Sequence, residues 1–555
     1  MRKCYSKLIA GMCTILLLIG AVGCQIETPT TDTQDPNGSG QPIQSSESAE
    51  WAGDGVVLVV GESVDFVSFD PLGYVDGQGF YHYSKLVYET LVNFKNGQAV
   101  PALAQSWEEN NGVWTFHLRE GDTFTDGAAL NAEAVKLNFE MLQEHMMEAI
   151  SYYGGISRIT EIETPDEYTL VIHYDAPYYA VLEDLSAIAF GILSPNLFAD
   201  GNVPYGAVLD YTAGTGPYML TSDNISSGTS YTFVSNQGYS GTVSGPDEII
   251  VKIIPDPDSR MMAMQTGEID LLYGSYQITY DMFDYLSGQD GLQAEQSSEI
   301  YATRNLLLNT VSDMLSDPLV RKALHYGTDK NQINTAILHG MEQPADTLFP
   351  THLAYCDVEQ QVYAYDPEFA ISLLEEAGWA ELNSQGIRTK DGAELALEVI
   401  YMSERSADEQ ILMTFKGQMA SIGVDIIISG YETMTWFEKG LMGEFDISVN
   451  DTYGFPQDPH VFVAAMLDYG LDNPAQQGLS QKSDIDSYIS AMLNTTNPNV
   501  IQEAYTFVLA TLQDECVNIP TTYLHEMAIY NTNVVAGFSF SADPAVCNLT
   551  ELVLS

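Results

Sequence analysis

The residues of this chain whose types could do chemistry include a near-match to a zinc-protease motif. His525 and Glu526 begin like HExxH, in which two histidines one helical turn apart bind the metal. Ile529 stands where the second histidine is needed, so this zinc site lacks one ligand. The phosphate-binding GxxxxGK[ST], nucleophile-bearing GxSxG and dinucleotide-binding GxGxxG patterns are absent from the sequence. The sequence therefore predicts a protein without catalytic residues of its own.

A second set of chemical candidates consists of soft and borderline metal donors. His145 is followed by Met146 and Met147, which places an imidazole beside two thioethers, and His82 offers another imidazole. His145 is therefore the candidate metal residue. The alternative is that His145 is a solvated helix residue and that the two methionines belong to the core.

The elements that must position these residues alternate between short strands and helices of ordinary length. The predicted helices span 131–143, 318–337, 367–377 and 407–422. The predicted strands span 113–118, 169–174, 249–254, 395–401 and 424–428. Asn131 is placed to cap the first of these helices, and Pro318 to start the second. This alternation predicts an α/β architecture.

The first residues are similar to a bacterial lipoprotein signal. Arg2 and Lys3 precede a short apolar run, and small residues lead into Cys24, which such signals present for lipidation. The alternatives are an ordinary secretory signal or an uncleaved anchor. The following residues are polar, so we expect a signal peptide at 1–23 and a lipidated cysteine with a flexible linker at 24–52. This predicts an extracytoplasmic protein, lipid-anchored on the outer face of the cytoplasmic membrane.

The charge and the cysteines exclude several other classes. A formal net charge of -56 argues against a nucleic-acid partner, since phosphate contacts need Lys and Arg. Beyond the predicted signal and Cys24, the cysteines are Cys356, Cys516 and Cys547, without the Cys and His spacing of a zinc site. Either Cys516 and Cys547 form a disulfide, or all three are buried thiols.

Five segments, in this order, resemble family 5 of the solute-binding proteins of bacterial ABC importers, which take up peptides, nickel and related solutes. They are WTFHLREGDTFTDG at 114–127 leading into LNAEAV at 130–135, GTGPY at 214–218, IPDPDSR at 254–260 continuing to 274, RKALHY at 321–326, and YDP at 365–367 ending in EAGW at 376–379. Four short segments resemble the nickel-binding branch of this family. They are IDLLYG at 269–274, ADTLF at 345–349, YGFPQDPH at 453–460 and QQGL at 476–479.

The resemblance implies a two-lobed periplasmic-binding-protein-like fold (class II) with a hinge and a ligand cleft between the lobes. Lobe I is expected at 53–251 plus 520–555, and lobe II at 252–519. The implied function is capture of nickel, as a small chelate, for delivery to an ABC permease and its ATPase subunits. The chain is expected to be a monomer that needs no cofactor, nickel being the transported ligand.

The resemblance also assigns residues to the cleft. Tyr453 aligns with an aromatic residue that lines the cleft in this family, and Phe437 aligns with another aromatic residue. Gln457 and Asp458 follow Tyr453 in the same loop. Tyr81, beside His82, takes the place of a ligand-facing residue of lobe I.

The family's chelator-binding arginines and metal histidine are missing, however, from 145–151, 188–192 and 470–472, where they are expected. The alternative is therefore an oligopeptide- or dipeptide-binding protein in which Asp451 or Asp458 pairs with the peptide ammonium. The resemblance implies a structural role for His460.

Overall fold

The computed structural model describes residues 55–555, apart from 73–78, 96, 147–149, 152, 206–210, 242, 455–457, 469, 542 and 544. The expected signal peptide, Cys24, the linker, Met147 and Gln457 lie outside the described residues. Among the described helices, none is both long enough and apolar enough to cross a bilayer.

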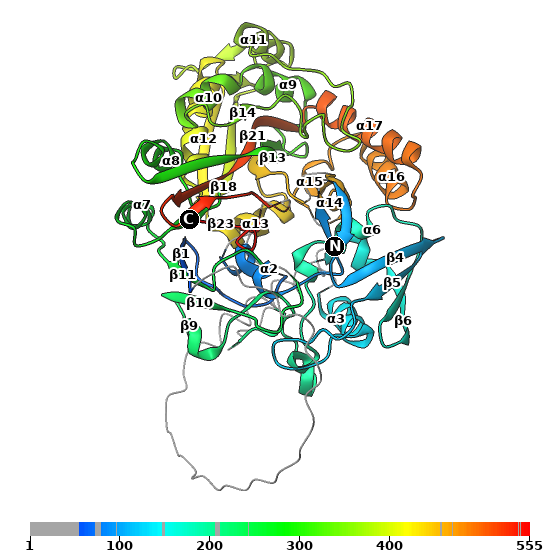
Figure 1. The fold of residues 1–555 in the computed structure, drawn as a ribbon. Coiled ribbons are helices and arrows are strands. Elements are labelled where there is room, and N and C mark those ends of the chain that lie inside the picture. Colours follow the sequence, from blue (N-terminus) through cyan, green and yellow to red (C-terminus); the bar gives the residue numbers. More distant parts are fainter. Residues whose placement is uncertain are drawn as a thin grey trace, which may run out of the picture.

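A mixed sheet of twelve strands runs through the whole molecule (Figure 1). Its strand order is β19 (Asp425–Tyr431), β18 (Ala396–Met402), β20 (Ile447–Asp451), β13 (Leu292–Leu308), β21 (Asn518–Asn531), β12 (Leu271–Tyr273), β1 (Val57–Glu62), β11 (Glu248–Ile253), β10 (Ser230–Ser235) and β8 (Tyr218–Met219). Off this path, β14 (Gln343–Pro344) pairs with β21 and β9 (Ile225–Ser226) with β10.

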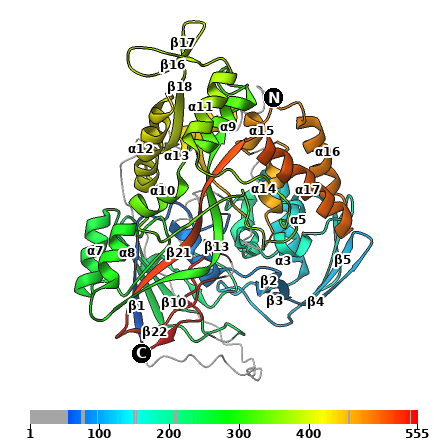
Figure 2. The same cartoon turned by 90° about the horizontal axis from the view of Figure 1, so that it is seen from above.

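Two long antiparallel strands join the two ends of this sheet. β13 has 17 residues and β21 has 14, and they pair from Leu292 opposite Asn531 to Leu307 opposite Asn518. Figure 2 shows them side by side across the middle of the molecule. Their register shifts between Gln296 and Ala302 and again after Arg304. Such bulges bend a ladder locally, so these strands form the hinge of a two-lobed molecule.

The two lobes have separate cores. The lobe I core includes a second sheet, β4 (Ala104–Asn110), β5 (Val113–Leu118), β7 (Thr169–Tyr174) and β6 (Ile159–Asp166), and residues of the C-terminal segment from Ala528 to Leu552. Helices of lobe II cover the other end of the long sheet.

The lobe boundary expected at residue 251 stays a prediction. β12 pairs with β1 in parallel, and α7 (Pro257–Thr266) and α8 (Tyr280–Ser287) contribute to a core cluster with Ile529, against which Val59 packs. We propose from these contacts that lobe I continues through α8 and that the boundary lies within β13.

The remaining helices are short or lie on the lobe surfaces. They are α2 (Ser84–Val87), α3 (Ala132–His145), α5 (Gly154–Ser157), α6 (Val181–Asp184), α9 (Pro318–Tyr326), α10 (Lys330–Ile337), α11 (Pro367–Glu376), α12 (Ser406–Ser421), α13 (Thr433–Met442), α14 (His460–Ala465), α15 (Asp472–Ala475), α16 (Lys482–Met492) and α17 (Pro498–Asp514). Small sheets are β2 (Val92–Lys95) with β3 (Gln98–Pro101), β15 (Glu381–Leu382) with β16 (Arg388–Lys390) and β17 (Ala393–Glu394), and β22 (Val535–Gly537) with β23 (Val553–Leu554).

One predicted helix is wrong. The span 318–337 contains two helices, α9 and α10, because the chain turns at Gly327 and the Asp329 side chain then accepts a hydrogen bond from the Gln332 amide to start α10. A Cβ at Gly327 would lie 2.8 Å from Ile422, so the turn packs tightly against the end of α12. Cys356, Cys516 and Cys547 are all buried and free, which corrects the disulfide alternative.

Candidate functional site

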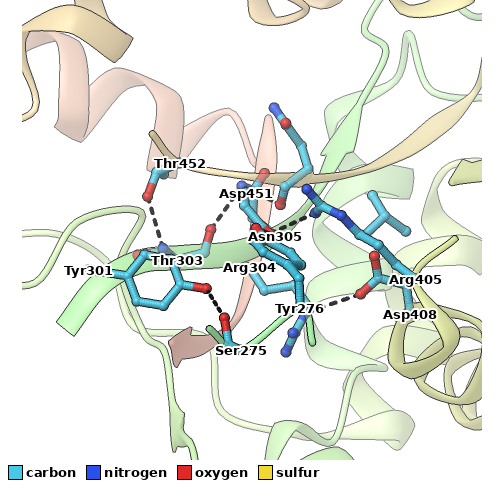
Figure 3. A network of polar contacts seen from close by, with 12 residues as sticks. Ser275, Tyr276, Tyr301, Thr303, Arg304, Asn305, Arg405, Asp408, Asp451 and Thr452 are labelled. Carbon is cyan, nitrogen blue, oxygen red and sulfur yellow. Dashed lines mark hydrogen bonds and ion pairs between the residues drawn. The ribbon is translucent and has the colours of Figure 1, made fainter. Parts of the chain in front are cut away.

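The candidate site lies where the hinge strands cross between the lobes (Figure 3). Ser275 and Tyr276 reach it from the loop after β12, residues 301–304 from the bulged part of β13, and residues 451–453 from the end of β20. Arg405 reaches it from the turn before α12. Elements distant in sequence therefore meet here because their strands are neighbours in one sheet.

An arginine, a carboxylate and a tyrosine form the first contact group. Arg405 Nη1 donates to Asp451 Oδ2 at 2.7 Å, and the Tyr276 hydroxyl donates to the same oxygen at 3.0 Å. The Arg405 guanidinium carbon also lies 4.5 Å from the centre of the Tyr276 ring. Such a cation–π contact is strengthened where water is excluded. The group joins the β12 loop to the lobe II strand β20.

A second arginine lies deeper, on β13. Arg304 Nη1 donates to Glu342 Oε2 at 2.7 Å and to Thr522 Oγ1 at 3.1 Å, and its Nε lies 3.2 Å from Asp408 Oδ1. All of the charged side chains here are nearly inaccessible to water. Burial raises the pKa of the Asp408 carboxyl to about 6, although Arg304 and Arg405 act in the opposite direction.

A third group surrounds Glu526 on β21. Its carboxylate accepts a hydrogen bond from the Ser275 amide at 2.8 Å, and the Ser275 and Tyr301 hydroxyls are 2.7 Å apart. Burial raises the pKa of the Glu526 carboxyl to about 7, while the Ser275 amide and His82 favour the charged form. This acid lies on the strand that crosses between the lobes.

A pocket opens beside these contacts. It is lined by Ile300, Tyr301, Ala302, Thr303, Phe349, Pro350, Leu353, Thr452, Tyr453 and Pro459. Tyr453 is 42% exposed, and its ring centre lies 4.9 Å from that of Phe462. The Thr303 amide donates to Thr452 Oγ1 at 2.8 Å, which fixes the loop after β20 against the bulge of β13. The volume of the pocket, about 10 Å³, is that of one water molecule, so it offers a solute the exposed Tyr453 ring and not an enclosed cavity.

The structure brings only some of the predicted site residues to this place. Tyr453 and Asp451 lie together at the end of β20. Phe437 is half-buried on α13 against the lobe II core. Tyr81 is half-buried against the lobe I core, and His82 is buried with its Nδ1 2.8 Å from Glu62 Oε2.

The other predicted residues are elsewhere. His145 is exposed in the last turn of α3, followed by the half-buried Met146. Asp458 is buried and accepts hydrogen bonds from the Tyr505 hydroxyl at 2.7 Å and the His460 amide at 2.9 Å. The roles assigned to all these residues stay predictions.

Sequence reasoning missed Arg405, Arg304 and Tyr276. The composition contained one signal for the arginines, which is that the chain has only 20 Lys and Arg residues against 76 Asp and Glu residues. Arg405, which follows the predicted strand 395–401, was therefore a candidate for a buried ion pair. Which acids would meet them depends on sheet register, which the local pattern does not contain.

Comparison with known proteins places these features in context. The sequence profile of the bacterial extracellular solute-binding proteins, family 5 Middle, matches residues 98–473. The nickel-binding periplasmic protein of Escherichia coli (strain K12) is 31% identical over 450 residues, covering 80% of this chain and 85% of that protein. The dipeptide-binding protein of the same strain is 27% identical over 429 residues, covering 72% and 76%. The crystal structure of NikA from Brucella suis in complex with Fe(III)-EDTA superposes with a TM-score of 0.83 at 31% identity, covering 90% of this chain and 100% of that one.

Proposed function

The chain belongs to family 5 of the bacterial extracellular solute-binding proteins, and from this membership we propose that it captures nickel as a complex with a small chelator. The lobes would close on the complex and present it to the permease of an ABC importer. Closure requires that the ligand bind the closed form more tightly than the open form. Proteins of this family serve transport, so the site is one of binding and release.

The surface around Tyr453 supports this proposal. An exposed tyrosine faces the bulged hinge strand there, and the ion pair of Arg405 with Asp451 lies on the same strand end. A planar guanidinium is suited to the carboxylates of a chelator. The similarity to the nickel-binding periplasmic protein supports this choice of ligand.

A peptide is the second candidate ligand, supported by the similarity to the dipeptide-binding protein. The peptide ammonium would need a carboxylate, and Asp451 and Asp458 are the candidates. Asp451 pairs with Arg405, and Asp458 accepts hydrogen bonds from Tyr505 and from the His460 amide. An ammonium at either carboxylate would compete with these contacts, as a chelator carboxylate at Arg405 would compete with Asp451. The choice of nickel therefore depends on the greater similarity to the nickel-binding protein.

Calorimetric titration of the purified protein with nickel alone, nickel plus histidine, and pooled short peptides tests the proposal. We expect heat of binding only with nickel plus histidine. Tyr453→Ala should weaken this binding by about fivefold, because one aromatic contact is worth about 1 kcal/mol. Tyr285→Ala on α8, where the tyrosine is 49% exposed, is the matched control and should bind normally. Binding of peptides alone would overturn the nickel proposal in favour of the peptide.

The predicted lipid anchor has its own test. Cys24→Ser should move the protein from the membrane fraction to the soluble fraction, because the thiol that would carry the lipid is gone. Cys13→Ser, within the apolar run, should leave the distribution unchanged. Immunoblots of fractionated cells measure this distribution. Retention of the Cys24→Ser protein in the membrane fraction would contradict the lipoprotein prediction.

A further inference from the structure

A buried cluster of acids and one histidine joins the lobes at a second place. α6 of lobe I carries Glu183 and Asp184, and lobe II contributes Asp458 and the first residue of α14, His460 (Figure 1). His460 Nε2 lies 2.8 Å from Asp184 Oδ1, and both side chains are fully buried. The contact therefore links two segments almost three hundred residues apart.

Three potential metal ligands converge in this cluster. His460 Nδ1 lies 3.5 Å from Asp458 Oδ1 and 4.0 Å from Glu183 Oε2, and one donor atom from each of the three residues lies within 4.8 Å of the other two. Around a tetrahedral zinc ion, donors about 2.1 Å from the metal are about 3.4 Å apart. Shifts of a few tenths of an ångström to about one ångström would bring these atoms to bonding distance.

The histidine is oriented as metal-binding histidines are. Metal ligands of this type donate their other ring N–H to a carboxylate, which sets the tautomer and aims the remaining nitrogen at the ion. Asp184 is placed to accept such a bond from His460 Nε2. Its other oxygen accepts hydrogen bonds from the Tyr178 hydroxyl at 2.9 Å and the Gly155 amide at 2.8 Å, so Asp184 is itself held in position.

The charge of the cluster also calls for a cation. Glu183, Asp184 and Asp458 surround one imidazole, and none of these side chains is more than 12% exposed. A protonated His460 could offset one of the three carboxylate charges, whereas a divalent ion could offset two. The nearby Arg158 contacts the Tyr178 ring and pairs with Asp175 instead.

We propose that Glu183, Asp458 and His460 bind a divalent transition-metal ion such as Zn²⁺, with Asp184 as the positioning residue. Its ligands come from both lobes, so the ion stabilises the arrangement in which the lobes meet. It is separate from the transported solute, so this proposal does not depend on the identity of that solute.

Zinc binding to the EDTA-treated, dialysed protein tests this proposal. Equilibrium dialysis should show one tight site in the wild type, and Glu183→Gln should weaken it by at least about tenfold. The matched control is Glu163→Gln, which removes one carboxylate from the exposed group of Glu161, Glu163 and His173. That control should bind zinc like the wild type. Co²⁺ bound in place of Zn²⁺ should give visible absorption bands that Glu183→Gln abolishes.

Thermal unfolding supplies a second readout. Zinc should raise the midpoint of the wild type and of Glu163→Gln but not that of Glu183→Gln. Without zinc, Glu183→Gln should be at least as stable as the wild type, because it lacks the unneutralised acid; this also shows that the variant folds. Equal zinc binding by wild type and Glu183→Gln would overturn the proposal. Absence of zinc binding by the wild-type protein would overturn it as well.

Discussion

Replacing Arg304 by methionine is expected to lower the free energy of unfolding by about 3–5 kcal/mol, the usual effect of removing one partner from a buried ion pair. Methionine fills much of the same volume but leaves Glu342 and Asp408 without their shared guanidinium. Urea denaturation at neutral pH measures the change. Because β13 crosses between the lobes, the loss should appear in the main cooperative transition.

Two further variants show whether charge is the cause. Lys95→Met removes an exposed cation that lies 3.8 Å from Glu551, and we expect a change below about 1 kcal/mol. Adding Glu342→Gln and Asp408→Asn to Arg304→Met should restore much of the stability. The two side chains that lose the guanidinium are then neutral. A loss for Arg304→Met no larger than that of Lys95→Met would contradict the importance of this network.

Glu526→Gln is expected to remove a pH dependence of stability worth up to about 3 kcal/mol, from 1.36 kcal/mol per pKa unit. Burial raises the pKa of Glu526 from its ordinary value of 4.5 to about 7, so the folded protein holds this proton more tightly than the unfolded chain. The stabilisation is present below pH 4.5 and is lost as the pH rises through 7. The glutamine oxygen still accepts the Ser275 amide without becoming charged.

Urea denaturation of both proteins at pH 5 and pH 8 measures this effect. The free energy of unfolding of Glu526→Gln relative to wild type should rise between the two pH values. Comparison with wild type cancels the contributions of other buried acids, such as Asp408 and Asp472, whose pKa values burial raises to about 6. Glu108→Gln, on an exposed position of β4, should show no such rise. A difference between Glu526→Gln and wild type that is constant with pH would refute the account.

Local pattern predicted much of the secondary structure. The strands at 113–118 and 169–174 match β5 and β7, and the Asn131 cap starts α3, because alternation and capping act over a few residues. β13 was not predictable in this way. Its first half is rich in Gln, Ser and Glu, and it is a strand because β21 pairs with it along its whole length.

The candidate site also has residues that local sequence predicts and residues that only long-range pairing brings together. Tyr453 and Asp451 were predicted as site residues from one short segment that resembles the family. The partners of Asp451, Arg405 and Tyr276, lie 46 and 175 residues away and meet it through sheet order. His460 was assigned a structural role, and only the approach of α6 reveals the acids around it.

The position of β21 has a consequence for how the chain reaches this fold. β21 lies between β13 and β12 in the sheet, yet it comprises residues 518–531 of 555. While the chain is being synthesised, β21 emerges from the ribosome after β12, β13 and β14, the strands with which it pairs. Earlier segments can collapse but cannot close the sheet, and such late long-range pairing slows folding. The nascent polypeptide therefore cannot complete this sheet until β21 has been synthesised.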